Sequence, residues 1–140
     1  MSETRKPPAH AILQPAGWRK PKGYANGIAA EGKLVFVGGQ IGWTGQSRFE
    51  CHDLVGQVRQ TLHNVLAVLA EAGAAPQHIV RMTWYVRDMD EYLAVRNELG
   101  PIYRDIIGRH FPAMALVEVR RLVEPGARLE IEATAVVPEA

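Results

Sequence analysis

The stretch DLVGQVRQTLHNVLAVLAEAGAAPQHIVRMTWYVR, residues 53–87, decides the fold because its hydrophobic period changes in the middle. In the first half, apolar residues recur at spacings of three and four, which is typical of one stripe of an α-helix. The residues of this stripe are Val55, Val58, Leu62, Val65, Leu66 and Leu69. Asp53 predicts the N-cap and Gly73 the C-cap. Residues 79–87 then alternate between apolar and polar, which predicts a half-buried strand.

Upstream of this stretch the sequence predicts two strands. Residues 33–41 form a β-branched and aromatic run that ends in two glycines and a glutamine-isoleucine pair, and they predict a strand. Residues 24–30 precede it across a turn at Glu31 and Gly32. We therefore expect these two segments to pair as an antiparallel hairpin.

Downstream of it the sequence predicts a second helix and two more strands. Asp88 predicts the N-cap of the helix, with Glu91 reaching back as in a capping box. Pro101 should bend or interrupt this helix before it ends at Gly108. The last predicted strands cover residues 113–121 and 128–137, and the turn Glu124-Pro125-Gly126 joins them.

The order β-β-α-β-α-β-β predicts an α+β fold, with one sheet and both helices on one face. Residues 23–140 form the single predicted domain. Residues 1–22, which hold four of the nine prolines, form an N-terminal arm. On residues 113–121 the alternation predicts Val117 and Val119 toward the helices. The opposite side would then carry Met114, Leu116, Glu118 and Arg120. A helix-free face that mixes large apolar and charged residues favours a homo-oligomer.

Composition excludes several classes of protein. The chain has 140 residues and a mass of 15.5 kDa, with 47% apolar and 22% charged residues, which is typical of one globular domain. A net charge of +1 disfavours a nucleic-acid partner. The lone Cys51 excludes an internal disulfide and fits a reducing compartment. Because no secretory signal and no run of about 20 apolar residues is present, we expect a cytoplasmic protein with no membrane partner.

Recognised motifs for metals, cofactors and nucleophiles are lacking. The histidines and the cysteine show no metal-ligand spacing, and no dinucleotide, phosphate-loop or serine-nucleophile motif occurs, so we expect neither a metal site nor a serine hydrolase. Cys51, just before a predicted helix and beside His52, is either an inert thiol or an activated one. Glu130 and Glu132 also leave two interpretations open. They pair with arginines such as Arg120 or Arg128 at an interface, or one of them handles a proton in a cleft.

Four ordered blocks of the chain resemble the RidA/YjgF family. They are Leu-Val-Phe-Val-Gly-Gly-Gln-Ile at 34–41, Gln-Val-Arg-Gln-Thr-Leu-His-Asn at 57–64, Pro-Ala-Met-Ala-Leu-Val-Glu-Val at 112–119 and Glu-Ile-Glu-Ala at 130–133. The resemblance implies a chorismate-mutase-like protomer in a homotrimer with a central barrel and clefts between subunits. It also implies hydrolytic deamination of small enamines or imines without a cofactor. The ligand would be an imino acid, a keto acid or a related metabolite.

The resemblance also implies a set of site residues. Glu130 matches the glutamate that directs water onto the C=N carbon. Gly38, Gly39 and Gln40 match the turn whose backbone amides help to hold the substrate, with Gly38 in place of the usual serine. Tyr24 matches a tyrosine of the cleft.

Met114 departs from the family pattern, because it stands where the family has the arginine that binds the substrate carboxylate. Leu116 replaces a cysteine two residues on. Either another arginine supplies the charge, with Arg96 the first candidate and Arg120 the second, or the substrate differs from 2-aminoacrylate and the pocket is more apolar. A non-catalytic, ligand-binding or regulatory trimer is the alternative function.

Overall fold

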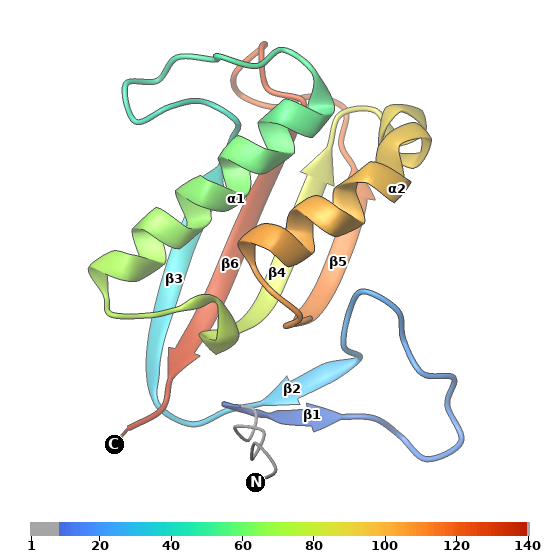
Figure 1. Cartoon of the computed structure of the whole chain (residues 1–140), viewed down its shortest axis with the longest axis vertical. Helices are drawn as coiled ribbons and strands as arrows, with labels where there is room; N and C mark the ends of the chain where they lie inside the picture. Colours follow the sequence, from blue (N-terminus) through green and yellow to red (C-terminus); the bar gives the residue numbers. More distant parts are fainter. Residues whose placement is uncertain (1–8, 140) are drawn as a thin grey trace, which may run out of the picture.

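The computed structural model describes residues 9–139, in which six strands, two α-helices and one 3-10 helix follow one another (Figure 1). The elements are β1 (Ala11–Leu13), β2 (Gly27–Ala29), β3 (Lys33–Gln40), α1 (Leu54–Glu71), η1 (Pro76–His78), β4 (Ile79–Val86), α2 (Met89–Ile106), β5 (Ala113–Glu118) and β6 (Leu129–Val137). The first eight residues of the predicted arm lie outside the described part. Among the described helices, none has the length and apolar character needed to cross a membrane.

The main sheet has four strands in the order β3-β6-β4-β5. Strand β6 lies between β3 and β4 and is antiparallel to both, whereas β4 and β5 are parallel and are connected through α2. Both helices pack on the same face of this sheet (Figure 1). The predicted α+β class, with both helices on one face, is therefore confirmed.

The predicted hairpin between residues 24–30 and 33–41 is wrong. Strand β2 pairs with β1 in a separate two-stranded sheet, and β3 pairs with β6 from Lys33, opposite Val137, onward. Gly32 has φ +145° and lies so close to the carbonyl of Val137 that a Cβ would collide with it. The chain therefore turns at Gly32, next to the end of β6. Strand β3 pairs with the long alternating strand β6 instead of with β2.

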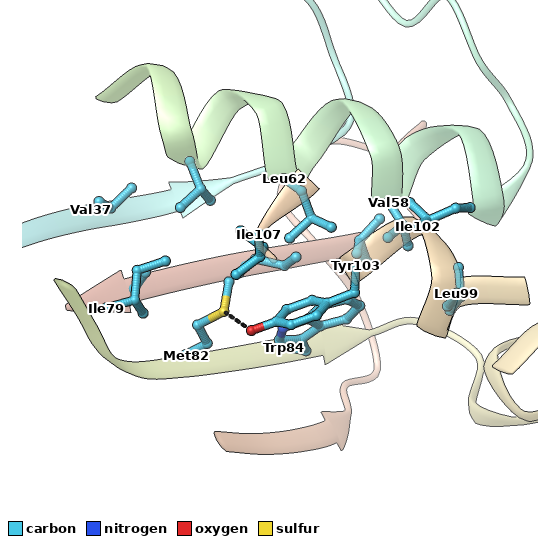
Figure 2. Close-up of a cluster of buried hydrophobic side chains, with 14 of the residues drawn as sticks. Val37, Val58, Leu62, Ile79, Met82, Trp84, Leu99, Ile102, Tyr103 and Ile107 are labelled. Atoms are coloured by element: carbon cyan, nitrogen blue, oxygen red, sulfur yellow. Dashed lines mark hydrogen bonds between the residues drawn. The ribbon is translucent and has the colours of Figure 1, made fainter. Parts of the chain in front are cut away.

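The core lies between the sheet and the two helices. Side chains from α1, including Val58 and Leu62, meet Met82 and Trp84 of β4, and Tyr103 of α2 covers this pair (Figure 2). All five are buried. Apolar burial and dispersion supply most of the stabilisation of such a core.

The helix ends follow local side-chain chemistry. The carboxylates of Asp53 and Asp88 accept hydrogen bonds from the amides of Gly56 and Glu91, so both predicted N-caps are confirmed. The expected capping box is wrong, because both carboxylate oxygens of Glu91 bind the guanidinium of Arg128 at 3.0 Å instead. Helix α2 also runs through Pro101 without interruption, and Pro101 is exposed.

The predicted orientation of β5 is wrong. In its parallel register with β4, Met114 lies beside Met82 and Leu116 beside Trp84, so both face the helices. Glu118 also turns toward α2, where its carboxylate accepts the amide hydrogen of Met89 at 2.9 Å. The pleat starts one residue out of phase with the prediction, because the pairing with β4 sets it.

The helix-free face nevertheless carries exposed apolar side chains. Leu34 and Phe36 of β3 are 59% and 71% exposed, and Val117 of β5 is 44% exposed. Glu130 and Glu132 of β6 lie on the same face, since Leu129, Ile131 and Ala133 are buried on the other. Apolar and acidic side chains therefore share this surface, as expected, but Val117 takes the place predicted for Met114 and Leu116.

Three histidines lie near the start of β4. His10 precedes β1, His78 ends η1, and His110 lies between α2 and β5. Burial lowers the pKa of His78, and the charges of His10 and His110 lower it further. Burial also lowers the pKa of His110, against the effect of the hydrogen bond from its ring to the carbonyl of Ile79 at 2.6 Å. Nε2 of His10 lies 3.3 Å from the carbonyl oxygen of His78. Protonation of His78 and of His110 is therefore less favourable in the folded state than in the unfolded chain.

We expect the folded state to lose stability as the solution is acidified below neutrality. Because the pKa values of His78 and His110 are lowered on folding, the unfolded chain takes up protons first as the pH falls below about 6.5. Stability is complete above that pH and is lost as the pH falls toward the folded-state pKa values. Urea unfolding at pH 7.5 and pH 5 measures the loss. His110→Gln should reduce it, and His63→Gln, at an exposed position on α1, should not. Equal losses in both variants would contradict this account.

Candidate functional site

A pocket of about 500 Å³ opens between α2, β5 and residues 22–24. Its volume is within the usual range for small-molecule sites. Four residues that the sequence predicted for ligand binding line it, namely Tyr24, Arg96, Met114 and Leu116. The register of β4 and β5 explains this placement, because it turns Met114 and Leu116 toward α2. Arg120, the other arginine considered, is exposed and does not line the pocket.

Most of the pocket wall is aromatic or aliphatic. The lining residues of this kind are Tyr24, Trp84, Tyr92, Leu99, Tyr103, Phe111, Met114, Ala115 and Leu116. Tyr92, Tyr103 and Phe111 also line the pocket, although the sequence did not predict them as site residues. The apolar stripe of α2 contains the two tyrosines, so their spacing alone could not separate a pocket wall from a core.

The charged residues of the pocket are all cations. Lys22, Arg96 and Arg104 line it, and no lining residue is acidic. Among residues 9–139 the ion pair between Arg128 and Glu91 is the only one, so neither pocket arginine is neutralised within the chain. Burial raises the pKa of Tyr92, and the nearby charge of Arg96 partly opposes this. The positive charge favours an anionic ligand, although Met114 itself offers no charge and no donor.

Two buried aromatic residues with polar groups, Tyr103 and Trp84, form part of the pocket wall. Tyr103 stacks on Phe111 with ring centroids 5.7 Å apart, and its hydroxyl donates to the carbonyl of His110 at 2.9 Å. Burial raises the pKa of Tyr103 well above its usual value, so the phenol stays neutral. The indole nitrogen of Trp84 is buried and has no hydrogen-bond partner among the described residues. Such an unpaired donor is uncommon in a native core.

The predicted catalytic carboxylate lies elsewhere in the chain. Glu130 is half-buried on β6, beside a bulge where the pairing of β3 and β6 shifts between Val37 and Gln40. Gly39 lies in this bulge, and a Cβ there would overlap an oxygen of the Glu130 carboxylate. The turn and the glutamate are thus brought together, as expected. Gln40 donates to the carbonyl of Gly38 at 3.3 Å and therefore closes the turn on itself.

A second, smaller pocket of about 230 Å³ lies beside this turn on the helix-free face. Gly38, Arg81 and Glu132 are among its lining residues, but Gly39, Gln40 and Glu130 are not. The hydroxyl of Tyr85 donates to Glu132 at 2.5 Å. This hydrogen bond is the main cause of the raised pKa of Tyr85. Glu132 therefore has a partner within the chain.

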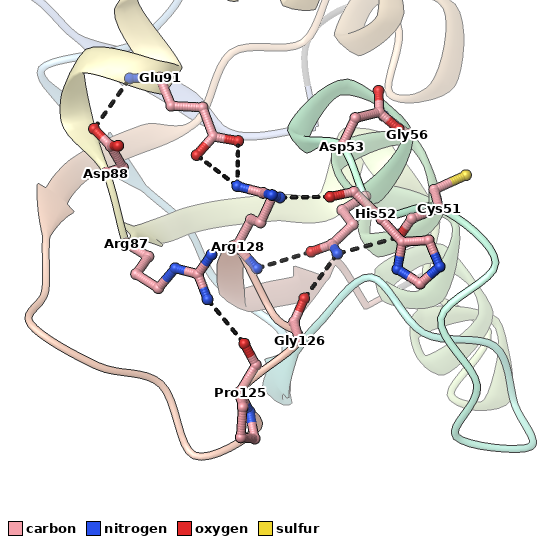
Figure 3. Close-up of polar contacts among 11 residues, drawn as sticks. Cys51, His52, Asp53, Gly56, Arg87, Asp88, Glu91, Pro125, Gly126 and Arg128 are labelled. Carbon is pink, nitrogen blue, oxygen red and sulfur yellow. Dashed lines mark hydrogen bonds and ion pairs between the residues drawn. The ribbon is translucent and has the colours of Figure 1, made fainter.

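The side-chain carboxylate of Glu130 has no hydrogen bond or ion pair among residues 9–139. Arg128, which one interpretation paired with Glu130 or Glu132, binds Glu91 and the carbonyl of His52 instead (Figure 3). Within the chain, Arg128 therefore pairs with neither Glu130 nor Glu132.

Cys51 and His52 belong to a structural junction at the start of α1 (Figure 3). The side chain of Gln57, which is fully buried, donates to the carbonyls of Cys51 and Gly126 and accepts from the amide of Arg128. The thiol of Cys51 packs so tightly on Gly56 that a Cβ there would collide with it. The sulfur and the His52 ring extend in different directions (Figure 3). In residues 9–139 no three His, Cys, Asp or Glu side chains are grouped to hold a metal ion.

The predicted site residues therefore fall into two groups within one chain. The pocket group, which is Tyr24, Arg96, Met114 and Leu116, lies on the helix side of the sheet. The turn group, which is Gly38, Gly39, Gln40 and Glu130, lies at the bulge of β3 and β6. Neither of the two pockets described above includes members of both groups.

Comparison with known proteins identifies the family. The family model described as "Endoribonuclease L-PSP" matches residues 19–137. A RutC family protein of Haemophilus influenzae is 38% identical over 75% of this chain and 80% of its own. The 2-iminobutanoate/2-iminopropanoate deaminase of Salmonella typhimurium is 34% identical over 81% of this chain and 86% of its own.

Solved structures of Rid-family proteins have the same fold as this chain. The Rid-family protein YyfB of Yersinia pestis, of unknown function, superposes with a TM-score of 0.78 at 27% identity and covers 92% of this chain and 99% of its own. TdcF of Escherichia coli, solved with bound serine, has a TM-score of 0.67 at 32% identity and covers 87% of this chain and 92% of its own. On the sequence blocks, the fold and these matches together, the chain belongs to the RidA/YjgF family.

Proposed function

We propose that this protein is a hydrolytic deaminase of small imines or enamines, acting as a homotrimer with sites between its subunits. The family supports this, because one relative of 34% identity is named as a deaminase of 2-iminobutanoate and 2-iminopropanoate. The substrate differs from 2-aminoacrylate, since Met114 stands where the family's arginine would bind a small imino acid.

The observation that carries the proposal is the free carboxylate of Glu130. It lies half-buried against the bulge at Gly39 and has no partner among the described residues. A carboxylate with a fixed arginine partner would be a poor proton acceptor, because the positive charge stabilises its ionised form. Glu130 carries no such restraint and can accept a proton from water.

The proposed reaction needs one water and no cofactor. Glu130 takes a proton from the water as its oxygen attacks the carbon of the protonated C=N bond. In the tetrahedral carbinolamine, the proton held by Glu130 passes to the amino nitrogen, and ammonia leaves. The freed carboxylate takes the proton of the hydroxyl group as the C–O bond becomes C=O, and this proton returns to the solvent, which supplied the one on the imine nitrogen. One imine and one water thus yield one ammonia and one carbonyl compound. An enamine first tautomerises to the imine.

Assembly into a trimer would join the pocket group of one chain to the turn group of the next. Two features support this arrangement. Neither of the two pockets of a chain holds members of both groups, and exposed apolar side chains, foremost Phe36 at 71%, lie on the helix-free face beside the turn. An interface on that face would bury them.

Ammonia release from freshly generated imines tests the proposed activity. An amino-acid oxidase would produce imines from a panel of amino acids, and the protein should raise the rate of ammonia and keto-acid release above the spontaneous rate. If pure trimer accelerates none of them, the protein is not a deaminase of this class.

Met114 favours one second candidate, a non-catalytic trimer that binds a metabolite. In that case thermal-shift screening would reveal stabilisation by keto acids without turnover of any imine. Glu130→Gln would then leave the biological effect of the protein in cells intact.

A further inference from the structure

We infer that Arg104 of α2 binds the carboxylate of the ligand in place of the arginine missing at position 114, and that the ligand carries an aromatic or large apolar side chain. This inference rests on the proposed function, because it names the substrate class of the same site. It differs from the expectation that Arg96 supplies the charge.

The position of the guanidinium carries the first half of the inference. Arg104 is exposed and lines the pocket together with Gly100, one helical turn before it. Its Nη1 lies 3.3 Å from the point where a Cβ on Gly100 would be. Long side chains on a helix extend toward its N-terminus, and the missing side chain at Gly100 leaves space for this one. The guanidinium therefore lies over the middle of the helical wall of the pocket.

Arg96 is less well placed for the same task. Its Cα is about 12 Å from that of Arg104 along the axis, because eight residues rise 1.5 Å each. The charge of Arg96 opposes the rise in the pKa of Tyr92, which lies one turn closer to the N-terminus of α2. The guanidinium of Arg96 therefore lies toward the N-terminal end of the helical wall of the pocket. A carboxylate held over Gly100 would meet Arg104 first. Arg104 also has no acidic partner among residues 9–139, so ligand binding breaks no ion pair.

The lining of the pocket carries the second half. The cavity of about 500 Å³ has room for far more than a three-carbon acid. Tyr92, Tyr103 and Phe111 together with Leu99, Met114 and Leu116 surround it. A small polar acid would leave these apolar side chains in contact with water. An aryl group would bury them and gain aromatic contacts.

Keto acids test this directly, because they are the products of the proposed reaction and bind without turnover. Isothermal titration calorimetry would compare phenylpyruvate with pyruvate on the full trimer. We expect phenylpyruvate to bind at least about ten times more tightly. Arg104→Gln should raise its Kd roughly tenfold to a hundredfold, as expected for a charge-assisted contact. Arg104→Lys, which keeps the charge, should restore part of this loss.

Arg109→Gln is the matched control, since Arg109 is an exposed arginine just beyond α2 that does not line the pocket, and its Kd should stay within about twofold of the wild-type value. The inference fails if Arg104→Gln behaves like this control, if Arg96→Gln carries the loss instead, if pyruvate binds as tightly as phenylpyruvate, or if neither acid binds.

The same measurements separate this inference from the deaminase proposal. Binding that depends on Arg104, without hydrolysis of the corresponding aryl imine, supports the ligand class and removes the catalytic function. Hydrolysis that is unaffected by Arg104→Gln supports catalysis and removes Arg104 as the anchor.

Discussion

Glu130→Gln is expected to lower kcat for imine hydrolysis by about 10²- to 10⁴-fold, the usual contribution of a general base. The amide keeps the shape of the side chain at the bulge of Gly39 but cannot accept the proton of water. Substrate binding should change little, because the residue acts on the water. Initial rates of ammonia release, with KM determined in parallel, measure the two effects separately.

Glu132→Gln is the matched control for this prediction. It lies two residues away on the same strand, and its carboxylate already accepts a hydrogen bond from Tyr85. The rate of this variant should stay within about threefold of the wild-type rate, since an amide oxygen can accept the same bond. Comparable losses in both variants would indicate a general disturbance of the face instead of a specific role for Glu130.

Phe36→Glu is expected to convert the trimer into a folded monomer without activity. Phe36 is 71% exposed on the helix-free face, so a charge there costs the isolated chain little. At a subunit contact, however, each buried and unpaired carboxylate would cost about 3 kcal/mol or more, repeated at every interface. Light scattering after size-exclusion chromatography should give the monomer mass at micromolar concentration. Circular dichroism should be unchanged.

Val68→Glu separates this effect from a general effect of added charge. Val68 is 37% exposed on α1, on the opposite layer of the molecule. This variant should keep the mass and activity of the wild type. If Phe36→Glu remains a trimer, the helix-free face is not the interface. If it becomes a fully active monomer, the site does not depend on assembly.

The sequence predicted the elements that local patterns determine. The period of α1 and the side chains of Asp53 and Asp88 specify helices and their first turns, and the structure confirms them. The errors arose where distant segments decide. The carboxylate of Glu91 pairs with Arg128, 37 positions away, instead of capping its own helix, and no local rule identifies this partner. Gly32 correctly predicted a turn before β3, but it could not indicate that β3 would pair with β6 instead of β2.

The pocket was the least predictable feature. The resemblance named Tyr24, Met114 and Leu116, and these do meet in one cavity. The pleat of β5, however, depends on its register with β4, so alternation alone placed Met114 and Leu116 on the wrong face. Arg104 had no sequence signal beyond its spacing of four from Gly100, which becomes meaningful only when the helix is seen against the sheet.

The central claim is that two chains build each site, and mixed trimers test it most directly. Glu130→Gln removes the proton acceptor, and Leu116→Trp fills the pocket that Leu116 lines. Each variant alone should form an inactive trimer of normal mass and normal circular dichroism. When equal amounts are unfolded and refolded together, half of the pockets are intact and half of the neighbouring glutamates are intact. About a quarter of the sites, and of the wild-type activity, should return. Mixed trimers that stay inactive would show that a site does not combine the pocket of one subunit with Glu130 of its neighbour.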